Sequence, residues 1–429
     1  MVNSIEKFLK EKYGINEKVV AAVNKAEEEI KEYTEKLDEI REYNQYKVIS
    51  AMQTSYLGSS DFHWSTGYGY GDLGREKVEE IYAKVFGTED ALVRPTISSG
   101  THALYLTLSG ILRPNDELVY ATGAPYDTLR QVIGTEGDEE GTLFDFGIRY
   151  NEVPLKDNKI DLENIKNIVK EDTKLVALQR STGYSDRRAF TVNELKEAID
   201  VIKSINKDII IMVDNCYGEF LDIIEPTNVG ADIMAGSLIK NPGGGLALAG
   251  GYIVGREDLV SMIANRLTAP GLGKDTGLTF GTTRTTLQGF FLAPHVTMEA
   301  VKGAMLVGRV YESLGFEIVP KLDDPRSDII QAIKFNDPEK LGLFCEGIQS
   351  AATVDSFFTP EYAEMAGYED KVIMAAGGFI EGSSIELSAD GPMREPYYGY
   401  YQGGLTYDHC KLGVMISLNN LLKEDLIKL

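Results

Sequence analysis

Residues 209–214 read Ile-Ile-Ile-Met-Val-Asp, five apolar side chains followed by a carboxylate. A continuous apolar run rich in β-branched residues, without polar alternation, indicates a strand that is buried on both faces, as in a parallel sheet. A helical pattern over residues 191–206 precedes this run. The stretch therefore predicts a helix followed by a central strand that delivers Asp214 to one edge of a sheet.

Similar apolar runs recur nearer the N-terminus and alternate with helical patterns. Residues 91–93, 117–121 and 174–178 are short, continuous and apolar, and a helix-like pattern covers residues 101–109. Strands that alternate with helices are typical of a mainly parallel sheet with helices on both faces. We therefore predict a large α/β domain over residues 51–300.

The two ends of the chain differ from this central part. In residues 1–50 apolar side chains recur every three or four positions among Glu and Lys, which predicts a helical arm that packs on the body or on a partner subunit. Residues 58–74 are rich in Gly, Ser, Tyr and Asp and predict an ordered loop. Apolar runs at 372–376 and 385–388 predict strands of a smaller α+β domain over residues 301–429.

Composition narrows the class of protein. The 429 residues are 43% hydrophobic and 25% charged, which is ordinary for a folded chain of two or three domains. No apolar run approaches the roughly 20 residues of a membrane span, and the first ten residues mix acids with lysines, so we expect neither a membrane anchor nor a signal peptide. The net charge of −23 argues against nucleic-acid or membrane partners. An anionic ligand therefore needs a local site.

The three cysteines give no sign of a disulfide framework or a zinc site. Cys216, Cys345 and Cys410 are far apart and show no Cys-x-x-Cys spacing. This usage fits a reducing cytoplasm, and we expect no metal centre. Cys216 lies two residues after Asp214, and a small packing residue is the favoured interpretation of it.

Polar residues follow three of the predicted strands, at the edge where parallel sheets bind ligands. Asp214 ends the central strand. Ser99, Gly100 and Thr101 open the helix after another strand, and the free N–H groups of a helix start suit a phosphate. Tyr126 follows a third strand. Taken singly, these residues are also ordinary caps and surface side chains.

Lys240 is the residue that links these strand-end residues to one kind of site. It lies between Ser237 and a run of three glycines in residues 235–245. A lysine that forms an imine, a carboxylate that keeps a ring nitrogen protonated and a helix start that holds a phosphate are what pyridoxal phosphate requires. Ser237 could reach the phosphate, and the glycines let the chain turn closely around the lysine. We therefore predict a pyridoxal-phosphate enzyme with Lys240, Asp214 and Tyr126 as catalytic residues.

The same residues carry a resemblance to a known family, the Cys/Met-metabolism enzymes of fold type I. The resembling motifs are Val213-Asp214-Asn215-x-Tyr217, Gly230-Ala231-Asp232, Ser237-x-x-Lys240, Gly250-Gly251-x-Ile253-Val254-Gly255 and the phosphate loop Ser99-Gly100-x-x-Ala103, with Tyr126 as the ring-stacking tyrosine. A closer resemblance, to the aluminium-resistance or methionine-γ-lyase-like branch, covers nearly the whole chain. It rests on Gln179-Arg180-Ser181-x-Gly183-Tyr184, on residues 387–397 and on Gln402-Gly403-Gly404-Leu405-Thr406-Tyr407.

The resemblance implies a fold, a reaction and an assembly. The fold is the fold type I of pyridoxal-phosphate enzymes, with a large and a small domain. The reaction is β- or γ-elimination by a carbon-sulfur lyase on a sulfur-containing amino acid such as cystathionine, cysteine or methionine. The assembly is a homodimer or homotetramer in which a Tyr and an Arg of one subunit reach the phosphate held by its neighbour.

The chain departs from the parent family at two places. The imine lysine follows Leu-Ile here, whereas the family has Ala-Thr or a similar pair. The partner-subunit motif Tyr-x-Arg is absent in that form, and the segment Tyr68–Arg75 occupies a comparable place. Tyr70 and Arg75 are therefore the candidates for phosphate contact, although Arg75 could instead pair with Glu79 one helical turn away.

An amino-acid substrate carries a carboxylate, which a planar arginine binds best through two parallel hydrogen bonds. Arg394 is the leading candidate because it lies in a Gly/Pro-rich turn of the small domain, which supplies this arginine in the resembling family. The alternative is a surface pair with Glu395 or Asp390. Arg180 and Ser181 follow a predicted strand end and are further candidates for contact with substrate.

Other function classes stay open at this point. Another pyridoxal-phosphate reaction on an amino acid, such as transamination, decarboxylation or racemisation, would use the same residues. A non-enzymatic metal-tolerance protein would fit the acidic charge, but the 66 acidic residues form no dense cluster in the sequence. A nucleotide-binding loop is disfavoured because the glycines follow Lys240 rather than precede it.

Overall fold

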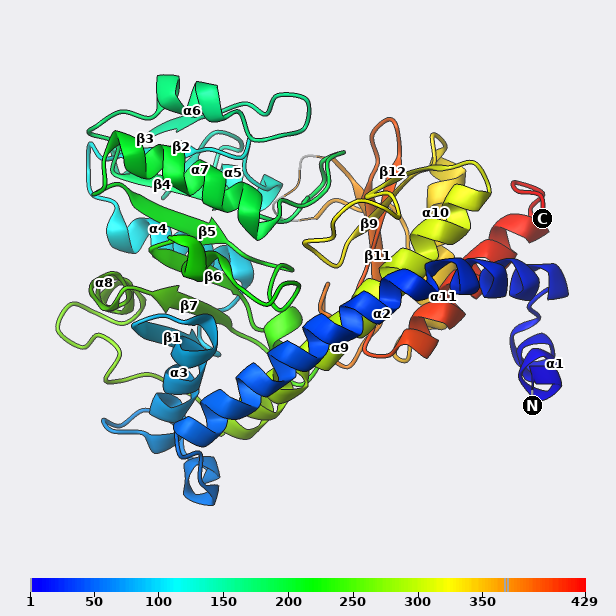
Figure 1. The fold of residues 1–429 in the computed structure, drawn as a ribbon, viewed down its shortest axis with the longest axis horizontal. Coiled ribbons are helices and arrows are strands. Elements are labelled where there is room, and N and C mark those ends of the chain that lie inside the picture. The colour runs from blue at the N-terminus through cyan, green and yellow to red at the C-terminus, as the bar shows by residue number, and fades with distance from the viewer. Residues whose placement is uncertain (1, 366–367, 369) are drawn as a thin grey trace. The chain divides into compact units, whose positions relative to one another are not determined.

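The computed structural model describes residues 2–365, 368 and 370–429 (Figure 1). The chain forms two compact units. One consists of residues 42–294, and the other of residues 1–41 together with 295–429. The division into residues 1–50, 51–300 and 301–429 that composition suggests stays a prediction about domains.

The unit of residues 42–294 is built on a seven-stranded sheet. Its strand order is β1-β7-β6-β5-β4-β2-β3. The four pairs formed by β2 to β6 are parallel, whereas β7 runs antiparallel to both of its neighbours, β6 and β1. The prediction of a mainly parallel sheet is thus confirmed. The strands are β1 Asp90–Arg94, β2 Glu117–Tyr120, β3 Arg149–Glu152, β4 Leu175–Gln179, β5 Ile210–Asp214, β6 Ile233–Ser237 and β7 Gly251–Gly255.

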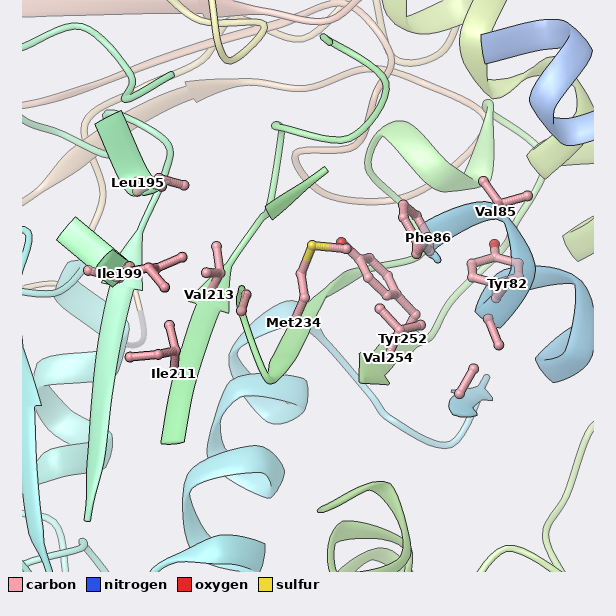
Figure 2. Close-up of a cluster of buried hydrophobic side chains, with 14 of the residues drawn as sticks. Tyr82, Val85, Phe86, Leu195, Ile199, Ile211, Val213, Met234, Tyr252 and Val254 are labelled. Carbon is pink, nitrogen blue, oxygen red and sulfur yellow. The ribbon is translucent and has the colours of Figure 1, made fainter. Parts of the chain in front are cut away.

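The central strands are apolar throughout because each face of the sheet has its own hydrophobic core. Ile211 and Val213 of β5 face one core, and Ile210 and Met212 face the other, as the alternation of side chains along a strand requires. Figure 2 shows part of the first core, where the rings of Tyr82 and Phe86 lie near Tyr252 of β7 and Met234 of β6.

Helices cover both faces of this sheet. On one face α3 and α7 supply the core, and on the other face α4, α5 and α8 do so. Several of these helices begin at a side-chain cap that accepts a backbone N–H, for example Ser99 before α4 and Thr191 before α7. The helices are α3 Leu73–Phe86, α4 Gly100–Ile111, α5 Asp127–Ile133, α6 Leu162–Ile168, α7 Val192–Ile205 and α8 Glu257–Leu267.

Two long helices belong partly to each unit. The helix α2, Glu17–Thr54, confirms the helical pattern predicted near the N-terminus, and Ala26 and Ile30 of its apolar stripe are buried. The helix α9, Thr283–Ser313, is long and apolar enough to cross a membrane by length and composition alone. Its most apolar window is 72% buried inside the protein, as in the core helix of a globular fold.

The second unit holds a five-stranded antiparallel sheet of order β10-β11-β12-β9-β8. The strand predicted at 385–388 starts later than expected, because the buried carboxylate of Glu386 accepts the N–H groups of Phe379 and Ile380 and holds this segment in turns. The elements are α1 Val2–Tyr13, β8 Glu317–Val319, β9 Gln331–Lys334, α10 Pro338–Ala351, β10 Val372–Ala375, β11 Ser388–Pro392, β12 Tyr398–Gln402 and α11 Tyr407–Lys423.

Candidate active site

The carboxyl ends of β5 and β6 lie side by side, because the two strands pair in parallel with Asp214 opposite Ala235. Asp214 is 6% exposed and accepts the backbone N–H of Cys216 at 3.1 Å. Burial raises the pKa of Asp214 to about 6, and the hydrogen bonds from Cys216 oppose this rise. A carboxyl in this state is readily ionised by a cationic partner that enters the site.

The loop after β5 rests on a buried ionic network. Arg180, which is 1% exposed, donates from Nη1 to Oδ1 of Asn215 at 3.0 Å and to the carbonyl of Gly218 at 2.8 Å, and lies 3.6 Å from Glu225. Glu225 in turn accepts from Nδ2 of Asn215 and from the N–H of Phe220. The guanidinium of Arg180 therefore lies beneath this loop and organises it.

Lys240 follows β6 and approaches the same loop. Its Nζ donates a hydrogen bond to the hydroxyl of Tyr217 at 2.5 Å and lies 4.5 Å from the centre of that ring. Both side chains are partly exposed. The amine is thus directed over the edge of the sheet that carries Asp214.

The start of α4 reaches the end of β6. A β-carbon on Gly100 would lie 3.3 Å from Cβ of Ser237 and 3.4 Å from Sγ of Cys216, so the start of α4 packs closely on the end of β6. The first N–H groups of a helix have no partners within it. Ser99 caps the helix by accepting the N–H of His102, and the hydroxyl of Thr101 contacts Thr128 at the start of α5.

Tyr126 lies where α5 begins, on the same edge of the sheet. Its backbone N–H donates to Oε1 of Gln179 at the end of β4, and its ring meets that of Tyr184 edge-on at 5.6 Å between centroids. Gly183 packs against the Tyr126 ring, since a β-carbon there would lie 3.1 Å from it. The segment after β4 therefore positions Tyr126. Ser181 is buried and accepts from Arg187 through its carbonyl.

Arg75 is buried and holds two loops together. It is 1% exposed and donates to the carbonyls of Gly67 and Asp275, each at 2.6 Å. Glu79 pairs with Arg94 across 2.7 Å. These contacts make Arg75 an anchor of the glycine-rich loop within its own chain.

Two further predicted residues make contacts of their own. Tyr70, in the loop anchored by Arg75, is 75% exposed and is directed away from the core. Arg394 belongs to the other compact unit and pairs with Asp370 at 3.0 Å, while Asp390 is buried. Their predicted roles in phosphate and substrate binding stay predictions.

The sequence-based candidates did not include several residues that shape the site. Tyr217 stood in a recognised motif without an assigned role, and Gln179 and Glu225 were not assigned one. A signal for Tyr217 existed in its position three residues after a buried strand-end carboxylate. No local pattern marks Glu225, because its partner Arg180 is far away in the sequence. Among the described residues, no group of three or more His, Cys, Asp or Glu side chains could hold a metal ion.

The fold is that of the fold type I pyridoxal-phosphate enzymes. The pyridoxal-5′-phosphate dependent protein YhfS from Escherichia coli superposes with a TM-score of 0.61 at 16% identity, covering 90% of this chain and 97% of that one. At this identity the likeness concerns the fold alone.

The chain belongs to the methionine gamma-lyase family, whose sequence model matches residues 19–422. A protein from Clostridium novyi NT described as a carbon-sulfur lyase involved in aluminum resistance is 51% identical, with a TM-score of 0.94 over 98% of this chain and 100% of that chain. The uncharacterized protein YnbB of Bacillus subtilis is 50% identical over 91% of this chain and 93% of its own length. The resemblance inferred from the sequence motifs is thereby confirmed.

Proposed function

We propose that the chain is a carbon-sulfur lyase that uses pyridoxal phosphate to cleave a sulfur-containing amino acid. The observation that carries the proposal is that Lys240 and the buried carboxyl of Asp214 reach one edge of the sheet on paired strands. The family membership supports the lyase class, and the relative from Clostridium novyi supports cleavage of a carbon-sulfur bond.

The residues present fit this cofactor. The close approach of Gly100 to Ser237 leaves backbone N–H groups of α4 beside a buried hydroxyl, which suits a phosphate. Tyr126 offers an aromatic face at the same edge of the sheet. Asp214 is a buried acid of raised pKa that would be ionised by a protonated pyridine nitrogen. When bound, the cofactor supplies an aldehyde that bonds covalently to amines and a ring that takes up electrons.

The chain's own residues have separable tasks in this proposal. Asp214 would supply a negative charge to the ring nitrogen of the cofactor. Lys240 carries the amine that would bond to the cofactor, and this amine could also move a proton at the α-carbon of the substrate. Tyr126 would offer its aromatic face to the ring, and Arg394 would bind the carboxylate of the substrate. The residues that would hold the phosphate are Ser99, Gly100, Thr101 and Ser237.

The experiment that tests the function combines a spectrum with product analysis. The purified protein should absorb in the violet and release a thiol, ammonia and an oxo acid from cystathionine, cysteine or methionine. Pyruvate as product indicates β-elimination from cysteine or cystathionine, and 2-oxobutyrate indicates γ-elimination. Release of an amino acid or of carbon dioxide without a thiol would contradict the lyase assignment and would indicate another reaction of the same cofactor.

The assembly proposed with this function is a cytoplasmic homodimer, or a pair of such dimers, with active sites at the dimer interface. It is supported by exposed aromatic side chains on the loops at residues 56–73 and 277–282, since large exposed apolar groups mark interaction surfaces. Their exposed fractions are 89% for Tyr56, 72% for Trp64, 77% for Tyr68, 75% for Tyr70 and 58% for Phe280.

A further inference from the structure

The loop between β5 and the next strand holds Tyr217 in a backbone conformation that a tyrosine rarely adopts. Its φ angle is +68°, in the left-handed region that favours glycine. Such residues persist only where the surrounding structure determines them, and they gather at functional sites. The surroundings of Tyr217 must therefore impose this conformation, and the conformation in turn decides where the hydroxyl of Tyr217 lies.

The cause lies in the residues on either side of Tyr217. The N–H of Cys216 is bound to the Asp214 carboxylate at 3.1 Å, and the N–H of Gly218 is bound to the carbonyl of Asn215 at 2.8 Å. Gly218 packs directly on Arg180, because a β-carbon there would lie 2.6 Å from Cδ of that arginine. The chain is thus fixed immediately before and after Tyr217.

The network beneath the loop keeps these neighbours in place. Arg180 binds the carbonyl of Gly218 and the side chain of Asn215, and Glu225 binds Asn215 and Phe220 from the other side. All of these groups are buried. The buried ionic network contacts this one short loop and therefore fixes the position of Tyr217.

The consequence is the contact with Lys240. The hydroxyl of Tyr217 accepts a hydrogen bond from Nζ of Lys240 at 2.5 Å. The same nitrogen lies 4.5 Å from the centre of the Tyr217 ring, close enough for a cation–π attraction. We propose that Tyr217 is a positioning residue that holds the amine of Lys240 whenever this amine is not bonded to the cofactor. A neutral amine accepts from the phenol O–H, and an ammonium group donates to the phenol oxygen, so the contact serves both protonation states.

This inference rests on the proposed function, because it assigns Tyr217 a task toward the lysine of that site. It predicts that the hydroxyl of Tyr217 speeds the bonding of Lys240 to the cofactor, both at first loading and at the end of each turnover. The fold should not need the hydroxyl, because the network of Arg180 and Glu225 holds the loop.

The test uses Tyr217→Phe, which keeps the ring and removes the hydroxyl. Full-length protein freed of cofactor is mixed with pyridoxal phosphate, and the adduct on Lys240 is trapped with borohydride and followed by mass spectrometry over time and pH. We expect the rate of adduct formation to fall about tenfold, and the pH at which the rate is half-maximal to move, with an unchanged melting temperature. Tyr150→Phe is the matched control, since its hydroxyl binds Glu152 and it lies outside the site; its rates should equal those of the wild type.

A second reagent separates the possible failures. Acetic anhydride labels Lys240 without any cofactor, and its labelling rate should change in Tyr217→Phe and stay constant in Tyr150→Phe. Identical adduct and labelling rates in Tyr217→Phe and wild type would overturn the positioning role. A wild-type protein that forms no adduct on Lys240 would instead overturn the proposed function. If Tyr217→Phe melts lower, Tyr217→Asn, which tolerates a positive φ, serves as the second variant with the same expected loss of rate.

Discussion

The hydroxyl of Tyr252 donates to Oε1 of Glu219 at 2.5 Å within the core of the larger unit. The other carboxyl oxygen of Glu219 has no hydrogen-bond partner among the described residues. Burial raises the pKa of Glu219 to about 8, from an ordinary value of 4.5. A carboxyl group that remains protonated in the native state couples folding to pH.

Between pH 4.5 and 8 the unfolded chain has lost the Glu219 proton and the native chain has kept it, so the free energy of unfolding falls as pH rises. The stabilisation is complete below the unfolded pKa and is lost as pH rises through about 8. The slope is at most about 1.4 kcal/mol per pH unit. We expect Glu219→Gln to flatten it in urea unfolding between about pH 7 and 8, a window above the pKa of Asp214, which is about 6. Equal slopes in this variant, in wild type and in the exposed control Glu163→Gln would contradict the assignment.

Arg180→Met should destabilise the protein by about 3 to 5 kcal/mol, because it leaves Glu225 buried without a compensating charge. Arg188→Met is the matched control. Its pair with Glu194 is partly exposed and should contribute no more than about 1 kcal/mol. The double variant Arg180→Met with Glu225→Gln should recover part of the loss. Chemical unfolding measures the stability of all three variants. Equal losses of stability in Arg180→Met and Arg188→Met would show that the buried network stabilises the protein no more than the partly exposed pair does.

Lys240→Ala should abolish the violet absorbance and the adduct that borohydride traps. The reason is that the variant lacks the amine to which the cofactor bonds. The exposed Lys196, which pairs with Asp200, provides the control variant Lys196→Ala, whose spectrum should be unchanged. An adduct that persists in Lys240→Ala would place the covalent bond on another lysine.

Asp214→Asn should bind the cofactor through Lys240 and lose turnover by roughly 100-fold, the size of effect typical for one charge-stabilising group. The amide has the shape of the carboxylate and cannot keep a pyridine nitrogen protonated by its charge. Steady-state rates and the visible spectrum report the two effects separately. Turnover close to that of the wild type would remove the role assigned to Asp214.

Mixing inactive chains tests the proposed dimer. Lys240→Ala and Tyr70→Ala chains should each be inactive alone, and together they should recover activity, since one site in the hybrid would have both residues intact. Tyr70 suits this test because it is exposed in its own chain, whereas Arg75 is buried and would perturb two loops. A fully active monomer in sedimentation experiments would contradict the proposed dimer.

Much of the large sheet could be predicted because its central strands are apolar on both faces. β5 is the clearest case, with every residue buried. β3 gives no such signal, because Arg149–Glu152 is an edge strand whose residues are polar and mostly exposed. The late start of β11 also escaped prediction, since it depends on where the Glu386 carboxylate finds its N–H donors.

The candidate site divides in the same way. Strand ends and a helix start mark the positions of Asp214, Lys240 and Gly100, so these residues can be predicted from the sequence alone. The buried pairing of Arg180 with Glu225 and the contact between Tyr217 and Lys240 arise from segments far apart in the chain. Nothing local distinguishes a surface arginine from one that organises a loop.

The order of the strands also bears on how the protein is made. The edge strand β1 has a single neighbour, β7, the last strand of the sheet in the chain, with Asp90 opposite Gly255. An apolar strand synthesised early therefore stays unpaired until nearly the whole unit has emerged, and such exposure favours aggregation. The high contact order of this pairing also predicts slow folding. The contact of Gly100 with Ser237 forms no earlier than β6 is complete, so the start of α4 and the end of β6 come together only late in synthesis.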